Sequence, residues 1–225
     1  MLFIRHATTP GMRSARFPAD ERADPASLAR AATLTGLLTT GAAPVHAAAP
    51  AGSAEVIGGP DEATRAQAAW VAPVRAATET AEAMGLVPRA APALGEADAG
   101  RWRGLPYDRV ARREPEELAR WLADPEAAPH GGESLAALAV RVGAWLESVR
   151  DEPAAVAVCD AGAIRAALGH ALGLDPRTAA RFDIAPLSTT ELTVTRDGWR
   201  VAHVNRKVIP WSPPTRSAPS SDSAT

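Results

Sequence analysis

Short apolar runs alternate along this chain with segments in which apolar residues recur every three or four positions. Leu2-Phe3-Ile4 and Val156-Ala157-Val158 each end at polar residues, which is typical of buried strands that deliver polar side chains at their carboxyl ends. The run over residues 67–72 predicts another strand. Helical spacing predicts helices over residues 25–38, from 73 to about 85, over 114–123, from 133 or 134 to 150, and one that ends near 171.

The last part of the chain carries a β-hairpin signal. Residues 190–195 and 199–204 flank Arg196-Asp197-Gly198, and Asp-Gly between two strands favours a tight turn. Residues 41–54 are low in complexity and predict a loop. Residues 212–225 are rich in Ser and Pro and predict a disordered tail, which leaves 1–211 as a single domain. The alternation of strands and helices predicts an α/β fold, a three-layer α/β/α sandwich with a mostly parallel central sheet.

Composition and charge exclude several classes of protein. The 225 residues contain 24 Lys and Arg against 26 Asp and Glu, a net charge of −2, which argues against nucleic acid as a partner. Cys159 is the only cysteine, so no disulfide forms within the chain. No apolar stretch reaches about 18 residues, and no secretory signal is visible. We therefore expect a cytoplasmic protein that acts on a small molecule, with no membrane partner and an oligomeric state left open.

Two predicted strands end in ionisable residues. Arg5 and His6 follow Ile4, and Cys159 and Asp160 follow Val158. Function in open α/β sheets sits at the carboxyl ends of the strands, so these residues are candidates for a common site. The thiol of Cys159 has two interpretations, a nucleophile or a small core residue.

Five segments, in this order and spacing, resemble the motifs of the histidine phosphatase superfamily, also called the phosphoglycerate-mutase-like family. The resemblance covers about residues 1–205 and implies the phosphoglycerate-mutase-like form of the α/β/α fold. The segments are Arg5-His6-Ala7-Thr8-Thr9, residues 72–81, residues 94–104, Gly131-Gly132-Glu133-Ser134 and residues 158–166.

The resemblance implies specific roles. Arg5 maps to a phosphate-binding arginine, His6 to the histidine that becomes phosphorylated, and Glu96 to the proton donor for the leaving group. Further candidates for binding the substrate are Thr9, Arg75, Glu79, His130 and Trp102. His130 can equally be a loop residue beside a helix N-terminus.

The sequence departs from the family pattern at two positions. Ala76 stands where the family has its second arginine, and Arg75 precedes it by one residue, about 100° around a helix. Asp160 stands where the family has its second histidine, and Ile164-Arg165-Ala166 fixes that alignment. A carboxylate about 4 Å from a phosphoryl oxygen repels it by on the order of 4 kcal/mol at an effective dielectric constant of 20.

These departures predict a site that has turned away from phosphate. We expect His6, Glu96 and Asp160 to perform acid–base chemistry, such as dehydration, isomerisation or cyclisation of a small, amine-bearing molecule in a biosynthetic pathway, with no cofactor. Three alternatives remain open. The protein is a phosphomonoester phosphatase or mutase that acts through phospho-His6, it is a non-catalytic descendant that binds a ligand or partner, or His6, Glu96 and Asp160 hold a metal ion.

Overall fold

A computed structural model describes residues 1–35, 67–152 and 155–208 of the chain. Its six strands form one sheet in the order β3-β2-β4-β1-β5-β6. Strands β1 to β4 pair in parallel, whereas β5 and β6 are antiparallel and complete one side of the sheet. The bounds are β1 Leu2–Arg5, β2 Ala68–Val71, β3 Val87–Ala90, β4 Val156–Cys159, β5 Ser188–Thr195 and β6 Gly198–Lys207. The predicted parallel sheet and the predicted hairpin are confirmed.

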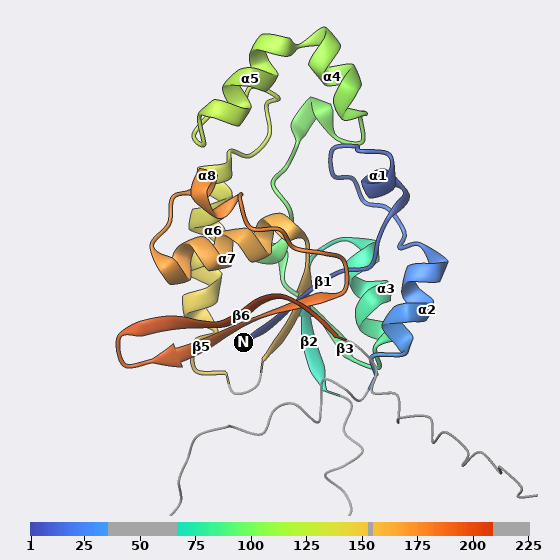
Figure 1. The fold of residues 1–225 in the computed structure, drawn as a ribbon, viewed down its shortest axis with the longest axis vertical. Coiled ribbons are helices and arrows are strands. Elements are labelled where there is room, and N and C mark those ends of the chain that lie inside the picture. Colours follow the sequence, from blue (N-terminus) through green and yellow to red (C-terminus); the bar gives the residue numbers. More distant parts are fainter. Residues whose placement is uncertain (36–66, 153–154, 209–225) are drawn as a thin grey trace, which may run out of the picture.

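Helices cover both faces of this sheet (Figure 1). Helix α2 (Pro25–Ala32) packs against α3 (Arg75–Ala83) on one side, and α6 (Leu135–Ser148) packs against α7 (Ala161–Leu172) on the other. The predicted α/β/α sandwich is confirmed. The remaining helices are α1 (Pro10–Arg13), α4 (Tyr107–Arg113), α5 (Pro115–Ala123), α8 (Pro176–Ala179) and two 3₁₀ turns at Pro92–Leu94 and Gly100–Trp102.

The two central strands are apolar because both of their faces are covered. Phe3 and Ile4 of β1 are fully buried, as are Ala157, Val158 and Cys159 of β4. Parallel strands enclosed by helices have no solvent-facing side, so they carry continuous apolar runs instead of alternating ones. This is why the sequence identified β1 and β4 clearly.

Local signals set the ends of the helices. The Ser134 hydroxyl accepts a hydrogen bond from the N–H of Ala137, so α6 begins at Leu135, next to the predicted start. Gly85, with φ +73°, follows α3 in the left-handed conformation that glycine favours. Helix α2 ends at Ala32, earlier than the sequence indicated, and residues 36–38 of that prediction lie outside the described residues.

A second apolar cluster lies under α4 and α5. Phe17, Trp102, Val110 and Leu118 form it, and Trp102 is fully buried. Figure 1 places α4 and α5 at the same end of the molecule as α1. Helix α4 escaped sequence analysis because Val110 is its only buried residue, so it has no apolar stripe.

Strand β3 was also not predicted. It lies at the edge of the sheet and contains Pro88 and Arg89, and none of its residues is fully buried. The predicted loop at 41–54 and the predicted tail at 212–225 lie outside the described residues. The domain boundary at residue 211 therefore stays a prediction.

Candidate active site

The pairing of β1 with β4 brings His6 and Asp160 together. Arg5 and Cys159 are register partners at the ends of these two parallel strands, so the next residue of each strand emerges at the same edge. The N–H of His6 donates to the carbonyl of Cys159 at 3.0 Å, which extends the ladder by one step. His6 Nε2 lies 2.6 Å from Asp160 Oδ1, so the two predicted residues are in direct contact.

The hydrogen bonds of His6 define where its protons are. Nδ1 lies 2.7 Å from the carbonyl oxygen of Ala7, which can only accept, so Nδ1 carries a hydrogen. A proton must also lie between Nε2 and Asp160 Oδ1, because two unprotonated acceptor atoms 2.6 Å apart would repel each other. Burial of His6, which is 3% exposed, opposes its charged form. The charge of Asp160 and the hydrogen bonds to Asp160 and Ala7 outweigh that effect and raise the pKa of His6.

Glu96 lies close to this pair. Its carboxylate accepts hydrogen bonds from the N–H of Gly162, at 2.9 Å, and from its own neighbour Ala97, at 3.0 Å. Burial raises the pKa of Glu96, and the charge of Asp160 adds to the effect, whereas these two N–H groups oppose it. A carboxyl group that retains its proton above its ordinary pKa is suited to act as a general acid.

Gly162 is a functional position that the sequence analysis missed. A Cβ at this residue would lie 1.8 Å from Glu96 Oε1, so any larger residue would displace the carboxylate. The signal was present in the sequence as the glycine two residues after Asp160, at the start of α7. Only a residue without a side chain lets the helix backbone donate to Glu96 at this distance.

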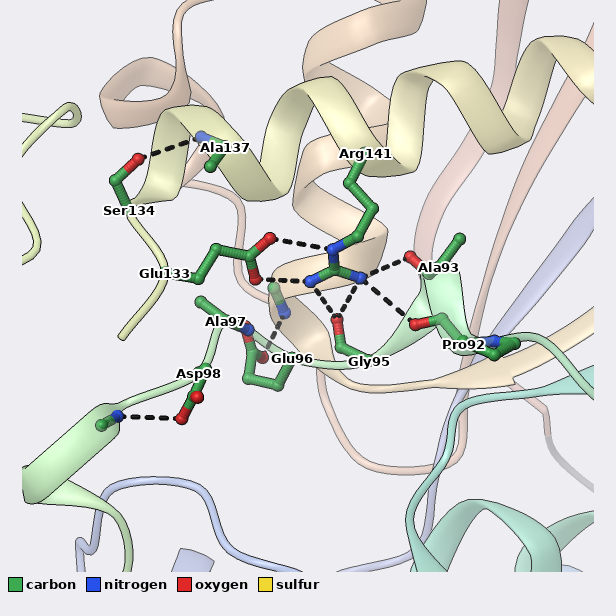
Figure 2. Close-up of polar contacts among 12 residues, drawn as sticks. Pro92, Ala93, Gly95, Glu96, Ala97, Asp98, Glu133, Ser134, Ala137 and Arg141 are labelled. Carbon is green, nitrogen blue, oxygen red and sulfur yellow. Dashed lines mark hydrogen bonds and ion pairs between the residues drawn. The ribbon is translucent and has the colours of Figure 1, made fainter. Parts of the chain in front are cut away.

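Arg141 of α6 holds the segment that leads into Glu96 (Figure 2). Its guanidinium donates to the carbonyl of Ala93 at 2.7 Å and to the carbonyl of Gly95 at 3.2 Å. Two further bonds, at 2.9 and 2.6 Å, join it to both oxygens of Glu133. This planar, fork-like arrangement ties the backbone directly before Glu96 to a long helix. Sequence analysis used Glu133 only as part of a motif and did not identify Arg141.

A cavity of about 450 Å³ lies over His6, Asp160 and Glu96. Five predicted site residues line it, namely Arg5, His6, Thr9, Glu96 and Asp160. Thr9 also caps α1 by accepting from the N–H of Met12. Ala76, at the position of the absent arginine, lines the cavity too.

Two arginines of the cavity are anchored by one segment of the chain. Arg5 Nη1 donates to the carbonyl of Ile184, and Arg165 Nε donates to the carbonyl of Phe182 at 2.9 Å. Arg5 Nε is buried without a hydrogen-bond partner among the described residues. Arg165 thus lines the cavity together with Arg5, Arg16 and Arg103, and the sequence analysis used it only to align Asp160.

Four other candidates for substrate binding lie outside the residues that line this cavity. Arg75 contacts Asp20, with its backbone N–H bonded to the Asp20 carboxylate at 2.8 Å. Glu79 accepts from the N–H of Ala23 at 2.8 Å. Trp102 is buried in the second cluster and donates from Nε1 to Glu114, and His130 packs edge-on against it with ring centroids 4.9 Å apart. The contact of these four residues with substrate stays a prediction.

Two open alternatives are weakened by the structure. Cys159 is fully buried in β4, and burial raises the pKa of its thiol well above the ordinary value, so the core interpretation fits better than the nucleophile. Among residues 1–35, 67–152 and 155–208, no three His, Cys, Asp or Glu side chains are placed to hold a metal ion. Within the same ranges, no helix is long and apolar enough to cross a membrane.

The sheet order β3-β2-β4-β1-β5-β6, with helices on both faces, is that of a phosphoglycerate-mutase-like protein. A profile of the histidine phosphatase superfamily, branch 1, matches residues 54–207, which is more than half of the 225 residues. The chain belongs to this superfamily.

Similar proteins agree with this assignment. Phosphoserine phosphatase 1 of Hydrogenobacter thermophilus is 39% identical over 75 residues, which cover 33% of this chain and 36% of that protein. The match thus spans about a third of the relative's length. A mycobacterial glucosyl-3-phosphoglycerate phosphatase has a TM-score of 0.71 at 22% identity, covering 92% of this chain and 98% of its own. A phosphoserine phosphatase of Entamoeba histolytica also has a TM-score of 0.71, at 13% identity, covering 91% and 95%.

The sequence predicted acid–base chemistry of a lyase- or isomerase-like enzyme. That prediction is wrong, because the relatives and structural neighbours are phosphatases. The absent arginine at Ala76 and the carboxylate of Asp160 do not by themselves set the charge of the cavity. Arg165 lines the same cavity, and His6 and Asp160 share a proton.

Proposed function

We propose that this protein is a phosphomonoesterase that transfers the phosphoryl group of a small molecule to His6 and then to water. The observation that carries the proposal is the orientation of His6. Its Nδ1–H is held by the Ala7 carbonyl, so Nε2 is the atom that faces Asp160 and the cavity lined by Arg5, Arg165 and Glu96. Nucleophile, cations and general acid thus meet at one cavity.

The charges of the cavity fit a phosphate dianion once its protons are placed. Glu96 is neutral when it holds its proton, and the His6–Asp160 pair is neutral when it shares one. Arg5 and Arg165 then give the cavity positive charge beside His6. The cavity is also lined by Arg16 and Arg103, which Glu21 and Asp98 offset, and by Asp20, which pairs with Arg75. Fixed cations and hydrogen-bond donors of this kind stabilise the charge that develops during phosphoryl transfer.

The first chemical step follows from the shared proton. The Nε2 proton of His6 passes to Asp160, and the neutral carboxyl then rotates away from the Nε2 lone pair and donates to a phosphoryl oxygen. Nε2 attacks phosphorus, the bond from phosphorus to the ester oxygen breaks, and Glu96 gives its proton to that oxygen. Asp160 thereby supplies the hydrogen bond that a second histidine supplies elsewhere in the family.

The second step returns the site to its starting state. The Glu96 carboxylate takes a proton from water, whose oxygen attacks phosphorus and breaks the bond to Nε2. Inorganic phosphate leaves, and the proton on Asp160 returns to Nε2. Each proton lost in the first step is thus restored.

The test measures hydrolysis of nitrophenyl phosphate. In parallel, the enzyme is quenched with base or with acid during turnover, and the phosphoryl group bound to the protein is measured. We expect release of nitrophenol, a base-stable and acid-labile phosphoryl group on the protein, and loss of both in His6→Ala. His203→Gln is the matched control, because His203 lies on β6 and bonds to Thr189, away from the cavity. Absence of hydrolysis by the unaltered protein, or an unchanged rate in His6→Ala, would refute the proposal.

A further inference from the structure

A second and larger cavity, of about 1110 Å³, adjoins the first. Four residues line both cavities, namely Pro18, Glu96, Ala97 and Arg165. The space over His6 therefore continues past Glu96 to residues of α5, α6, α7 and α8.

The position of Glu96 indicates which part of the substrate the larger cavity would hold. In the proposed function, the phosphoryl group lies against His6 and the ester oxygen lies against Glu96. The attacking and leaving atoms are roughly in line through phosphorus. The alcohol portion of the substrate thus lies on the far side of phosphorus from His6. Glu96 and Arg165 are on that side, where the larger cavity begins.

The walls of the larger cavity combine apolar and cationic side chains. Leu122 of α5 and Val140 of α6 are 53% and 73% exposed, which is high for large apolar side chains that line a cavity. Arg177 of α8 and Arg181 also line it, and neither guanidinium has an ion pair or hydrogen bond among the described residues. The lining can therefore contact both an apolar group and an anion.

The acidic side chains of the larger cavity offset only one of its arginines, because Asp175 is ionised and Glu96 is held toward its neutral form. Asp175 accepts from the N–H groups of Arg177 and Thr178 and from the Thr178 hydroxyl, so its carboxylate is engaged as the cap of α8. Glu96 is held toward its protonated form by burial and by Asp160. With Arg165 assigned to the phosphoryl group, Arg177 and Arg181 against Asp175 still leave a net positive wall.

We propose that the larger cavity binds the alcohol portion of the substrate, and that this portion has an apolar chain or ring that ends in a second anionic group. The inference rests on the proposed function, because it uses Glu96 as the acid that marks the leaving oxygen. A volume of about 1110 Å³ exceeds what a compact alcohol such as serine needs. The substrate class is therefore a long, amphiphilic phosphomonoester with charge at both ends.

The test is steady-state hydrolysis of two synthetic series, alkyl phosphates and ω-carboxyalkyl phosphates of matched length. We expect kcat/KM to rise with chain length in both series and to be highest for the long carboxylates. Arg177→Gln with Arg181→Gln should raise KM for the carboxylates by about tenfold, through loss of charge-assisted hydrogen bonds, and leave the alkyl series unchanged. Leu122→Asn should raise KM for long members of both series.

Arg200→Gln is the control, because Arg200 is exposed on β6 and bonds to Thr193. Equal kcat/KM for all lengths and termini, or no effect of the arginine pair, would overturn the inference and leave the proposed function standing. Failure of the proposed function looks different, since no phosphomonoester of either series would then be hydrolysed and no phosphohistidine would form.

Discussion

His6 Nε2 and Asp160 Oδ1 lie 2.6 Å apart at the ends of two neighbouring parallel strands. In the proposed function, this contact takes the place of the family's pair of histidines. The proton shared by His6 and Asp160 then determines when Nε2 is available and when Asp160 can face a phosphoryl oxygen.

Replacing Asp160 with asparagine should change the pH profile of nitrophenyl phosphate hydrolysis. In the unaltered protein, raising the pH through the raised pKa of His6 removes the shared proton, and the remaining carboxylate repels the phosphoryl group. The amide of the Asp160→Asn variant carries no charge, so at high pH this variant should exceed the unaltered protein by roughly tenfold or more. Nuclear magnetic resonance titration should report a lower pKa for His6. Identical pH profiles would contradict this coupling.

We expect Arg165 to supply the positive charge that the Ala76 position lacks, because both residues line the cavity over His6. Arg165→Met should therefore lower kcat/KM for nitrophenyl phosphate by about 10²–10³, the usual cost of removing one donor to a developing anion. Inorganic phosphate should also inhibit the variant less strongly. Arg30→Met, an exposed change on α2, is the control and should leave both quantities unaltered. A rate for Arg165→Met equal to that of Arg30→Met would exclude Arg165 from the phosphate site.

The loss of rate in Glu96→Gln should depend on the leaving group of the substrate. Alkyl oxygens need a proton as they leave, so kcat for an alkyl phosphate should fall by about 10²–10⁴. Nitrophenolate leaves without protonation, so the rate of phosphoryl transfer from nitrophenyl phosphate should fall far less in single-turnover measurements. An equal loss for both esters would assign Glu96 a structural part instead of an acid role.

Arg141 should act on the reaction through the position of Glu96. Arg141→Met removes the bonds to the Ala93 and Gly95 carbonyls and leaves the Glu133 carboxylate without its partner. We expect a loss of kcat with alkyl phosphates that does not add to the loss in Glu96→Gln. The double variant is the decisive measurement, because additive losses would show that Arg141 supports activity by another route.

The free energy of unfolding should depend on pH through His6. Its pKa in the folded protein lies above the ordinary value of 6.5, so its pairing stabilises the fold fully below pH 6.5. That stabilisation is lost as the pH rises through the folded pKa. Urea unfolding at a series of pH values should show a decline above pH 6.5 that Asp160→Asn makes smaller. Parallel curves for the two proteins would contradict the assignment.

Strong local patterns made most of the fold predictable from sequence. The continuous apolar runs of β1 and β4, the Asp197-Gly198 turn and the Ser134 cap each determine an element by themselves. Strand β3 and helix α4 depend on their neighbours instead, because neither has a buried face of its own. Such elements leave no periodic signal in the sequence.

Two parts of the site were predictable from sequence, by different signals. His6 and Asp160 follow strand ends and lie in contact, and Glu96, which only the family motif indicated, lines the same cavity. Arg165 and Arg141 escaped notice because their importance comes from carbonyls of distant segments, at Phe182, Ala93 and Gly95. A charge count made from motif positions alone therefore gave the wrong class of reaction.

The register between β1 and β4 has an evolutionary consequence. Because Arg5 pairs with Cys159, whatever side chain follows Cys159 must face the side chain of His6, whatever its chemistry. Codons for aspartate and histidine differ only in their first base. A single point mutation at position 160 can thus exchange a proton acceptor for a cation beside the nucleophile while the backbone ladder stays intact. One base change at position 160 could therefore shift the pH range of the proposed activity without altering the sheet.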